Sequence, residues 1–290
     1  MGSAQSQEVE LGPIIDLTGV CNENVDSIHQ LEQSLSTRSY ATFSLTDESK
    51  IQSLHHLIRN ANTFFGEEQE EKNKLISDEG NVGYVKTSTR EFLKLRNLDI
   101  DRLKENESSD IDTDNASLSL QILEDIGWKC FTGLNRTSEN IISDEELIDL
   151  KECLEERASL SIVHYFPARK SESDDYIREM PKAKDICGHT ESSFETCSQH
   201  KDTGIFTLIL TSNVPGLEVY DTLLKCWIPL EKLIQNHRDS PKKEIMVLMM
   251  GHKAPLFLGN QYEPTLHRVS VEKDVERPSF LYFMDTAKIN

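Results

Sequence analysis

The chain has 290 residues, of which 37% are hydrophobic, enough for one large domain or two ordinary ones with a sizeable core. Its 50 acidic residues against 31 basic ones give a formal net charge of −19. Such a charge repels nucleic-acid phosphates and anionic lipid surfaces. We therefore expect a folded, soluble protein that binds no nucleic acid.

The sequence shows no sign of membrane insertion or secretion. No run approaches eighteen consecutive apolar residues, and residues 1–12 lack the apolar segment of a secretory signal. The six cysteines form no CxxC pair, so we expect free thiols in a reducing compartment and disfavour a structural zinc site. The expected location is cytoplasmic. The start of the chain also fits the N-myristoylation pattern, with Gly2 as acceptor, although a polar, unstructured start is the simpler interpretation.

The first half of the chain predicts mainly helices. Apolar residues at helical spacing indicate amphipathic helices, and capping residues mark some of their ends. These helices are expected at 25–35, at 46–65 with Gly66 after it, at 118–126 with Gly127 as its C-cap, and at 143–158 after a capping box that begins at Ser143. Short strands are expected at 12–17 and 40–45, and a strand or loop at 84–96.

Two polar segments interrupt this helical half. The charged run 67–74 is expected to be a solvated helix surface. Residues 97–115 are acidic and rich in Ser and Asp, with few large apolar side chains, so they predict a mobile loop.

The second half predicts a β-rich core. Short runs rich in Val, Ile, Leu and Phe are separated by turn residues, which is typical of an antiparallel barrel or jelly roll. The expected strands are 160–166, 204–210, 217–220, 245–250, 255–258, 266–271 and 279–284. Because no Pro/Gly linker separates the halves, we expect one compact unit, in which a helical region, 1–158, packs on a β core, 159–290.

A pair of metal-ligand residues precedes one of these strands. Side chains alternate along an extended segment, so His200 and Asp202 would point the same way and could hold one metal ion, with Lys201 turned aside. His267 is a candidate third ligand. Arg277 and Ser279, two residues apart, would share another strand face.

His-x-Asp is a weak pattern by itself, and it has a rival. His189 and Glu191 have the same spacing, but they lie in a polar stretch with no predicted strand to hold them. Cys197 could add a thiolate ligand, which would favour zinc; we interpret it as a free thiol instead. The strand that follows Asp202 favours the pair His200 and Asp202.

Several blocks, in order along nearly the whole chain, resemble one family, the isopenicillin N synthase-like non-haem iron(II), 2-oxoglutarate-dependent dioxygenases. The blocks of the second half are His164–Pro167, His200–Gly204, Gly216–Val219, Trp227–Pro229, Gly251, Leu266–Val269 and Arg277–Phe280. Pro13–Leu17, Phe64–Phe65 and Arg90–Phe92 resemble the family's more variable helical region.

The resemblance implies an α+β fold with a double-stranded β-helix (jelly-roll) core, flanked by helices mostly from the N-terminal half. It implies that His200, Asp202 and His267 bind Fe(II) and leave three coordination positions open. It also implies that Arg277 grips the far carboxylate of 2-oxoglutarate, a task suited to its planar fork of donors, while hydroxyl groups of the two residues Ser279 and Tyr165 contact the same cosubstrate.

The implied activity is oxidation of a small molecule by dioxygen, through hydroxylation or desaturation, while 2-oxoglutarate is converted to succinate and CO2. Two alternatives stay open. One is an iron oxidase of the same fold that does not use 2-oxoglutarate, and the other is a binding or scaffold protein that has lost catalysis. Departures from the family pattern at Val163, Lys201 and His252 indicate a divergent member.

Overall fold

Strands from both halves of the chain build one large β-sheet. The computed structural model of the protein describes residues 11–76, 83–105, 111–138, 141–167, 193–237, 242–272 and 274–286. The large sheet has eight strands in the order β1 (Ile14–Asp16), β2 (Tyr40–Leu45), β10 (Glu244–Met250), β7 (Phe206–Leu210), β12 (Arg277–Met284), β5 (Ser159–Tyr165), β4 (Arg90–Leu95) and β3 (Gly83–Lys86). All neighbours in it are antiparallel except β1 and β2.

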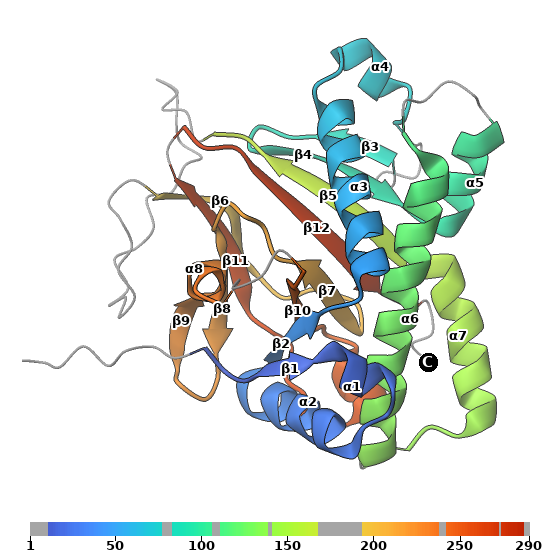
Figure 1. Ribbon diagram of the computed structural model, residues 1–290, viewed down its shortest axis with the longest axis vertical. Coiled ribbons are helices and arrows are strands. Elements are labelled where there is room, and N and C mark those ends of the chain that lie inside the picture. The colour runs from blue at the N-terminus through green and yellow to red at the C-terminus, as the bar shows by residue number, and fades with distance from the viewer. Residues whose placement is uncertain are drawn as a thin grey trace, which may run out of the picture.

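A smaller antiparallel sheet faces the large one (Figure 1). Its four strands follow the order β6 (Ser193–His200), β11 (His267–Glu272), β8 (Leu217–Asp221) and β9 (Cys226–Pro229). Apolar side chains of both sheets pack together: Val163 of β5 lies in one buried cluster with Val269 of β11, and Ile209 of β7 lies in another with Val219 of β8. The inner faces of the two sheets therefore share a core.

Helices cover the outer face of the large sheet, as Figure 1 shows for α3 and α6. The described helices are α1 (Leu17–Cys21), α2 (Val25–Arg38), α3 (Glu48–Phe65), α4 (Gln69–Asn73), α5 (Asn97–Glu105), α6 (Thr113–Thr137), α7 (Asp144–Arg157), α8 (Leu230–Gln235) and α9 (Ala254–Leu258). Leu57 of α3 and Phe131 of α6 share the main buried cluster with Tyr282 of β12. The predicted α+β class, with helices mostly from the N-terminal half, is confirmed.

The mobile loop predicted at 97–115 is wrong for the residues that the structure describes there. Residues 97–105 form α5, and α6 begins at Thr113 with Asp112 as its N-cap. Few apolar residues are needed, because Ile100 and Ile111 are both buried in the main cluster and the described polar residues of α5 need only face solvent.

The predicted end of a helix at Gly127 is also wrong. Helix α6 continues through this buried glycine to Thr137. A Cβ at Gly127 would lie 3.0 Å from a ring carbon of Tyr282, so the glycine allows close helix–sheet packing rather than a turn. The predicted strand 255–258 is wrong as well, because Ala254–Leu258 forms α9 with proline in its first turn.

Among the described helices, none is long and apolar enough to cross a membrane. Gly2, the candidate acylation site, lies outside the described residues.

A buried ionic network anchors β4 from behind. Glu91 is 2% exposed and accepts hydrogen bonds from Lys72 Nζ at 3.0 Å and from the Tyr84 hydroxyl at 2.6 Å, while His164 Nδ1 lies 3.1 Å from its other oxygen. Lys72 is buried, so the prediction of a fully solvated run at 67–74 is wrong at this residue. Burial alone would raise the pKa of Glu91, but these three bonds outweigh it and lower the pKa to about 2.

We expect Glu91→Gln to lower the free energy of unfolding by about 3 kcal/mol at neutral pH, because it leaves the Lys72 ammonium buried without its carboxylate. A carboxylate whose pKa is lowered on folding stabilises the protein above its ordinary pKa of 4.5, and that stabilisation is lost as the pH falls toward about 2. Urea unfolding should therefore show a difference in unfolding free energy between wild type and variant that becomes smaller as the pH falls from 4.5 toward about 2. The exposed Glu70→Gln serves as control, and a pH-independent difference would contradict the assignment.

Candidate active site

The register of three strands arranges the inner face of the large sheet in rows. Residues 90, 92 and 94 of β4 face inward, whereas Glu91, Leu93 and Leu95 are buried on the helix side. Directly paired residues of β4, β5 and β12 form the first row, Arg90, Tyr165 and Arg277, the second row, Phe92, Val163 and Ser279, and the third row, Lys94, Ser161 and Leu281. All nine side chains line a cavity of about 250 Å³ between the sheets.

Three candidate metal ligands meet at the floor of this cavity. His200 ends β6, Asp202 lies in the connection to β7, and His267 begins β11 directly opposite His200. The Nε2 atoms of His200 and His267 lie 3.6 and 3.8 Å from the Asp202 carboxylate oxygens. One ligand atom from each of the three residues lies within 4.8 Å of the others. The structure therefore brings together the three residues predicted from the sequence.

Both histidines present the same ring nitrogen to the carboxylate. His200 Nδ1 lies 2.8 Å from the Ser198 carbonyl oxygen, and His267 Nδ1 lies 3.1 Å from that of Thr265. A backbone acceptor at Nδ1 keeps the proton there and leaves the Nε2 lone pair free, the arrangement found in metal-binding histidines. Thr265 is itself held by hydrogen bonds to Met250 and Ser39.

The carboxylate of Asp202 is held by Thr207 of β7, whose hydroxyl donates to Oδ2 at 2.5 Å. Burial would raise the pKa of Asp202, but the bond to His200 and the field of His267 outweigh it and lower the pKa. The bonds to Asp202 and Cys197 raise the pKa of His200 to about 10. Burial lowers the pKa of His267. A cation bound by these ligands would take the place of the His200 proton.

Close backbone packing keeps the Asp202 connection in place. A Cβ on Gly251 would lie 2.1 Å from the Gly204 carbonyl oxygen, and one on Gly204 would lie 2.7 Å from the Met284 carbonyl oxygen. The backbone amide of His252 donates to the Asp202 carbonyl at 2.8 Å. Only glycine fits at these two contacts, so the connection is fixed by backbone bonds.

Arg277 lies 1% exposed in the first row, against a buried carboxylate from the smaller-sheet side. Its Nη2 donates to both oxygens of Glu231, at 2.9 and 3.0 Å, and its Nε donates to the Val214 carbonyl at 3.1 Å. Its Nη1 is buried and has no hydrogen-bond partner among the described residues. An unpaired guanidinium nitrogen in a cavity is costly, so this atom suits an anionic ligand.

Glu231 is bound from several directions. Besides Arg277, backbone amides of Ser212, Gly216 and Leu217 donate to its oxygens at 2.8 to 2.9 Å. A Cβ on Gly216 would lie 2.7 Å from Arg277 Cδ. The glycine and the glutamate together fix where the guanidinium lies.

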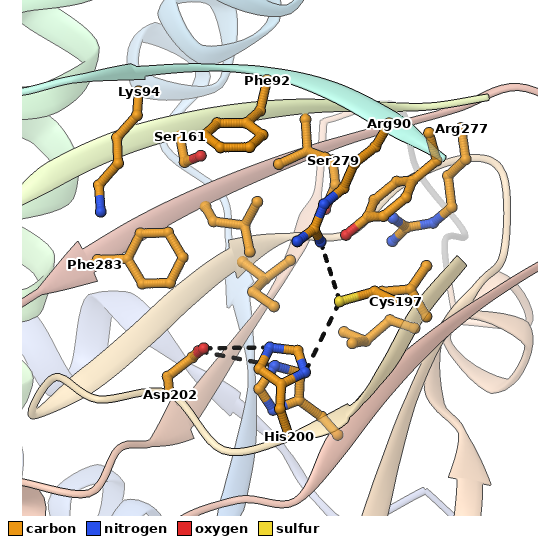
Figure 2. Close-up of a pocket in the computed structure, with 17 residues that line it drawn as sticks. Arg90, Phe92, Lys94, Ser161, Cys197, His200, Asp202, Arg277, Ser279 and Phe283 are labelled. Carbon is orange, nitrogen blue, oxygen red and sulfur yellow. Dashed lines mark hydrogen bonds and ion pairs between the residues drawn. The ribbon is translucent and has the colours of Figure 1, made fainter. Parts of the chain in front are cut away.

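The two other residues predicted for the cosubstrate also line the cavity. Tyr165 and Ser279 are each 3% exposed, and the Arg277 guanidinium lies 5.4 Å from the Tyr165 ring centroid. Burial and the nearby Cys197 raise the pKa of Tyr165 to about 12, so its hydroxyl keeps its proton and can donate. Figure 2 shows Arg277 and Ser279 on the same side of the cavity.

Cys197 and Arg90 form a contact at the edge of this site (Figure 2). Arg90 Nη1 donates to Cys197 Sγ at 3.1 Å, and the same sulfur lies 3.9 Å from His200 Nδ1. Cys197 Sγ thus lies near His200 Nδ1, the nitrogen that also faces the Ser198 carbonyl oxygen. The other ring nitrogen, Nε2, faces Asp202. The rival pair His189 and Glu191 lies outside the described residues.

Sequence reasoning missed several residues that position this site. Thr207, Thr265 and Glu231 act on other residues over separations of two to 46 positions, and none belongs to a recognisable ligand spacing. The strand β6, which carries His200, was also missed, because its sequence is polar and lacks the alternation of a half-buried strand. Only the position of Thr207 at the start of an apolar strand after Asp202 offered a signal.

We expect Thr207→Val to weaken Fe(II) binding about tenfold, because the isosteric side chain no longer donates to the Asp202 carboxylate. Calorimetric titration without oxygen measures this affinity. Thr222→Val removes a hydroxyl that bonds to Thr37, away from the cavity, and should leave the affinity unchanged. Equal affinities for wild type and Thr207→Val would contradict the role of this hydroxyl.

Comparison with known proteins shows which families and structures this chain resembles. A family model described as the 2OG-Fe(II) oxygenase superfamily matches residues 159–286. Clavatol oxidase claD of Penicillium crustosum is 29% identical over 87 residues, which cover 30% of this chain and 23% of that protein. The match to this curated relative therefore spans less than a quarter of its length.

Solved structures share the fold over most of their length. The dioxygenase for auxin oxidation 1 of Arabidopsis thaliana, solved with 2-oxoglutarate, has a TM-score of 0.69 at 14% identity, and the alignment covers 96% of this chain and 94% of that one. The dioxygenase for auxin oxidation of rice has a TM-score of 0.65 at 16% identity, with 94% and 82% covered. The part of this chain that matches the superfamily model, residues 159–286, contains the three candidate metal ligands together with Tyr165, Arg277 and Ser279.

Proposed function

We propose that this protein is a non-haem Fe(II)- and 2-oxoglutarate-dependent dioxygenase that hydroxylates or desaturates a small organic molecule and releases succinate and CO2. The observation that carries the proposal is one cavity with a cluster of two histidines and a carboxylate at its floor and a buried arginine with an unpaired nitrogen on its wall. The match of residues 159–286 to the superfamily model supports both cofactors.

The donor set suits Fe(II). Two neutral imidazoles and one carboxylate on one side of a cation leave the other positions to ligands that enter from the cavity. His200, Asp202 and His267 would hold the ion, and Thr207 and Thr265 would keep two of these ligands oriented.

The first row suits 2-oxoglutarate. Arg277 would bind the far carboxylate through Nη1, the atom that finds no partner within the described residues. The Ser279 hydroxyl and the protonated Tyr165 hydroxyl would donate to the same ligand. Glu231 pairs with Nη2 of Arg277 and fixes the orientation of the guanidinium group. A second carboxylate would therefore bind through Nη1.

With iron and 2-oxoglutarate bound, the site would supply an oxidant made from dioxygen as the cosubstrate is decarboxylated. The chain's own part is to orient the ligands and keep the reacting groups away from bulk water. The apolar side chains of Phe92, Val163 and Leu281 between the two ends of the cavity serve this purpose.

The two alternatives are less favoured by specific residues. An oxidase that does not use 2-oxoglutarate would have no need for a buried arginine with an unpaired nitrogen. A scaffold without catalysis would be free to lose ligands, yet all three lie within 4.8 Å of one another. The names of similar structures, such as the dioxygenase for auxin oxidation of Arabidopsis thaliana, support a small molecule as substrate.

The proposal also concerns the folding unit, the cellular compartment and the partners of this protein. Residues 1–158 and 159–290 would fold as one unit on a jelly-roll core, in the cytoplasm and without a nucleic-acid partner. The shared buried cluster of helices and large sheet supports the single unit. The net charge of −19 supports the absence of nucleic acid among the partners.

The central test is iron-dependent release of succinate from 2-oxoglutarate. We expect wild type to form succinate with a metabolite panel, and His200→Ala to lose at least two orders of magnitude in rate and most of its Fe(II) binding, because a two-ligand site holds the ion poorly. Oxygen consumption without succinate would favour the iron oxidase. Equal iron titrations of wild type and His200→Ala would contradict the site itself.

A second test addresses the cosubstrate. Arg277→Met should weaken 2-oxoglutarate binding on the order of 100-fold, because a charge-assisted hydrogen bond in a buried site is lost, while Fe(II) affinity stays unchanged. Glu231→Gln should weaken it as well, since the guanidinium loses its anchor. Without oxygen, the visible absorption of the iron–2-oxoglutarate complex measures both affinities. Unchanged 2-oxoglutarate affinity in Arg277→Met would contradict this assignment.

A further inference from the structure

Besides Arg90 and Arg277, Lys94 also lines the cavity, at the end away from Arg277. Lys94 belongs to the third row, and Ser161 of β5 lies directly opposite it on the neighbouring strand. Figure 2 shows Lys94 at one end of the cavity and Arg277 at the other. Lys94 lies four positions after Arg90, the β4 member of the first row, which corresponds to about 13 Å along the strand.

The ammonium group of Lys94 has no ion-pair partner in the described part of the chain. It lies against the ring of Phe283, whose centroid is 5.1 Å from Nζ. Burial lowers the pKa of Lys94, and the charges of Asp285 and Asp202 only partly offset this effect. A half-buried ammonium without a carboxylate partner is therefore a group that an incoming anion would stabilise.

The surroundings of Lys94 combine one charge with apolar walls. Phe283 lies beside Lys94, Phe92 lies one row nearer to Arg277, and Figure 2 shows Ser161 between Lys94 and Phe92. An ammonium and one hydroxyl can donate to the two oxygens of a carboxylate, and two aromatic rings can cover a flat apolar body. A phosphate dianion would call for more than one cation here.

Arg90 does not compete for this role. Its Nη1 donates to Cys197, and its guanidinium lies 5.9 Å from the ring of Tyr165 in the first row. It therefore belongs to the end of the cavity assigned to the cosubstrate. The cosubstrate 2-oxoglutarate has five carbons, and when bound to Arg277 and the metal it would leave Lys94 available to bind another ligand.

We propose that Lys94 and Ser161 bind the carboxylate of the prime substrate, and that this substrate is an organic acid with an aromatic or flat apolar body that packs against Phe92 and Phe283. The inference rests on the proposed dioxygenase function, and it makes Lys94 the residue that selects acids over neutral molecules. The acid would then lie between the rings and the metal ligands, where its apolar part meets the oxidant.

The test compares acids with their neutral amides. Phenylacetate, 3-phenylpropanoate and 4-phenylbutanoate, each paired with its amide, are titrated into the protein loaded with Fe(II) and 2-oxoglutarate without oxygen. Binding is followed by calorimetry and by the change in the visible absorption of the iron–2-oxoglutarate complex. We expect at least one acid to bind about 10- to 100-fold more tightly than its amide, the range for a hydrogen bond to a charged group.

Variants assign this preference to Lys94. Lys94→Met should abolish the preference for acids without lowering the affinity for 2-oxoglutarate. Lys94→Arg should keep part of the preference for acids, because the charge is retained. Lys232→Met removes the same charge from the surface, where Lys232 lies 3.9 Å from Glu272, and should change nothing. Ser161→Ala should reduce the preference to a smaller extent.

The outcomes separate the two proposals. If no iron–2-oxoglutarate absorption forms in wild type, the dioxygenase function fails before the acids are tested. If the complex forms but no acid binds better than its amide, or if Lys94→Met keeps the preference, the carboxylate subsite is overturned. A loss of 2-oxoglutarate affinity in Lys94→Met would instead place the cosubstrate at Lys94 and would also overturn it.

Discussion

The register of β4, β5 and β12 is the constraint on which the site depends. Side chains alternate across a sheet, so a slip of one residue would turn the row of Arg90, Tyr165 and Arg277 toward the helices and bring Glu91 into the cavity. The register is specified on both faces, because apolar helix contacts lie behind β4 and the cavity residues lie in front of it. One pattern of strand pairing thus places the cavity residues of these three strands at once.

Two buried carboxylates act on opposite faces of this sheet region. Glu91, behind β4, is bonded to Lys72, Tyr84 and His164 and ties the strand to α4. Glu231, at the start of α8, ties Arg277 to the smaller-sheet side and satisfies three backbone amides. The first carboxylate is fully paired inside the protein, whereas the second leaves its arginine one nitrogen short, which is why only the second points to a ligand.

Much of the site could be predicted because its strongest signals are local. His200 and Asp202 are two residues apart before an apolar strand, and Arg277 and Ser279 are two apart on another, so pattern and resemblance were enough to select them. The wrong predictions also came from local sequence patterns. The segment after Asn97 contains too few apolar residues to predict α5, and Gly127 resembles a helix end although it lies inside α6. In both cases contacts with other elements outweighed the propensity of the segment.

The sequence by itself determined the types of the candidate ligands, the order of the β-rich half and the acidic net charge, because these depend on composition and on spacings of a few residues. Only the tertiary structure decided that His267 meets His200 across β11 and β6, that Glu231 leaves one nitrogen of Arg277 free, and that Lys94 faces the same cavity from β4. These relations join residues separated by up to 183 positions, from Lys94 to Arg277, through strand pairing that no local pattern records.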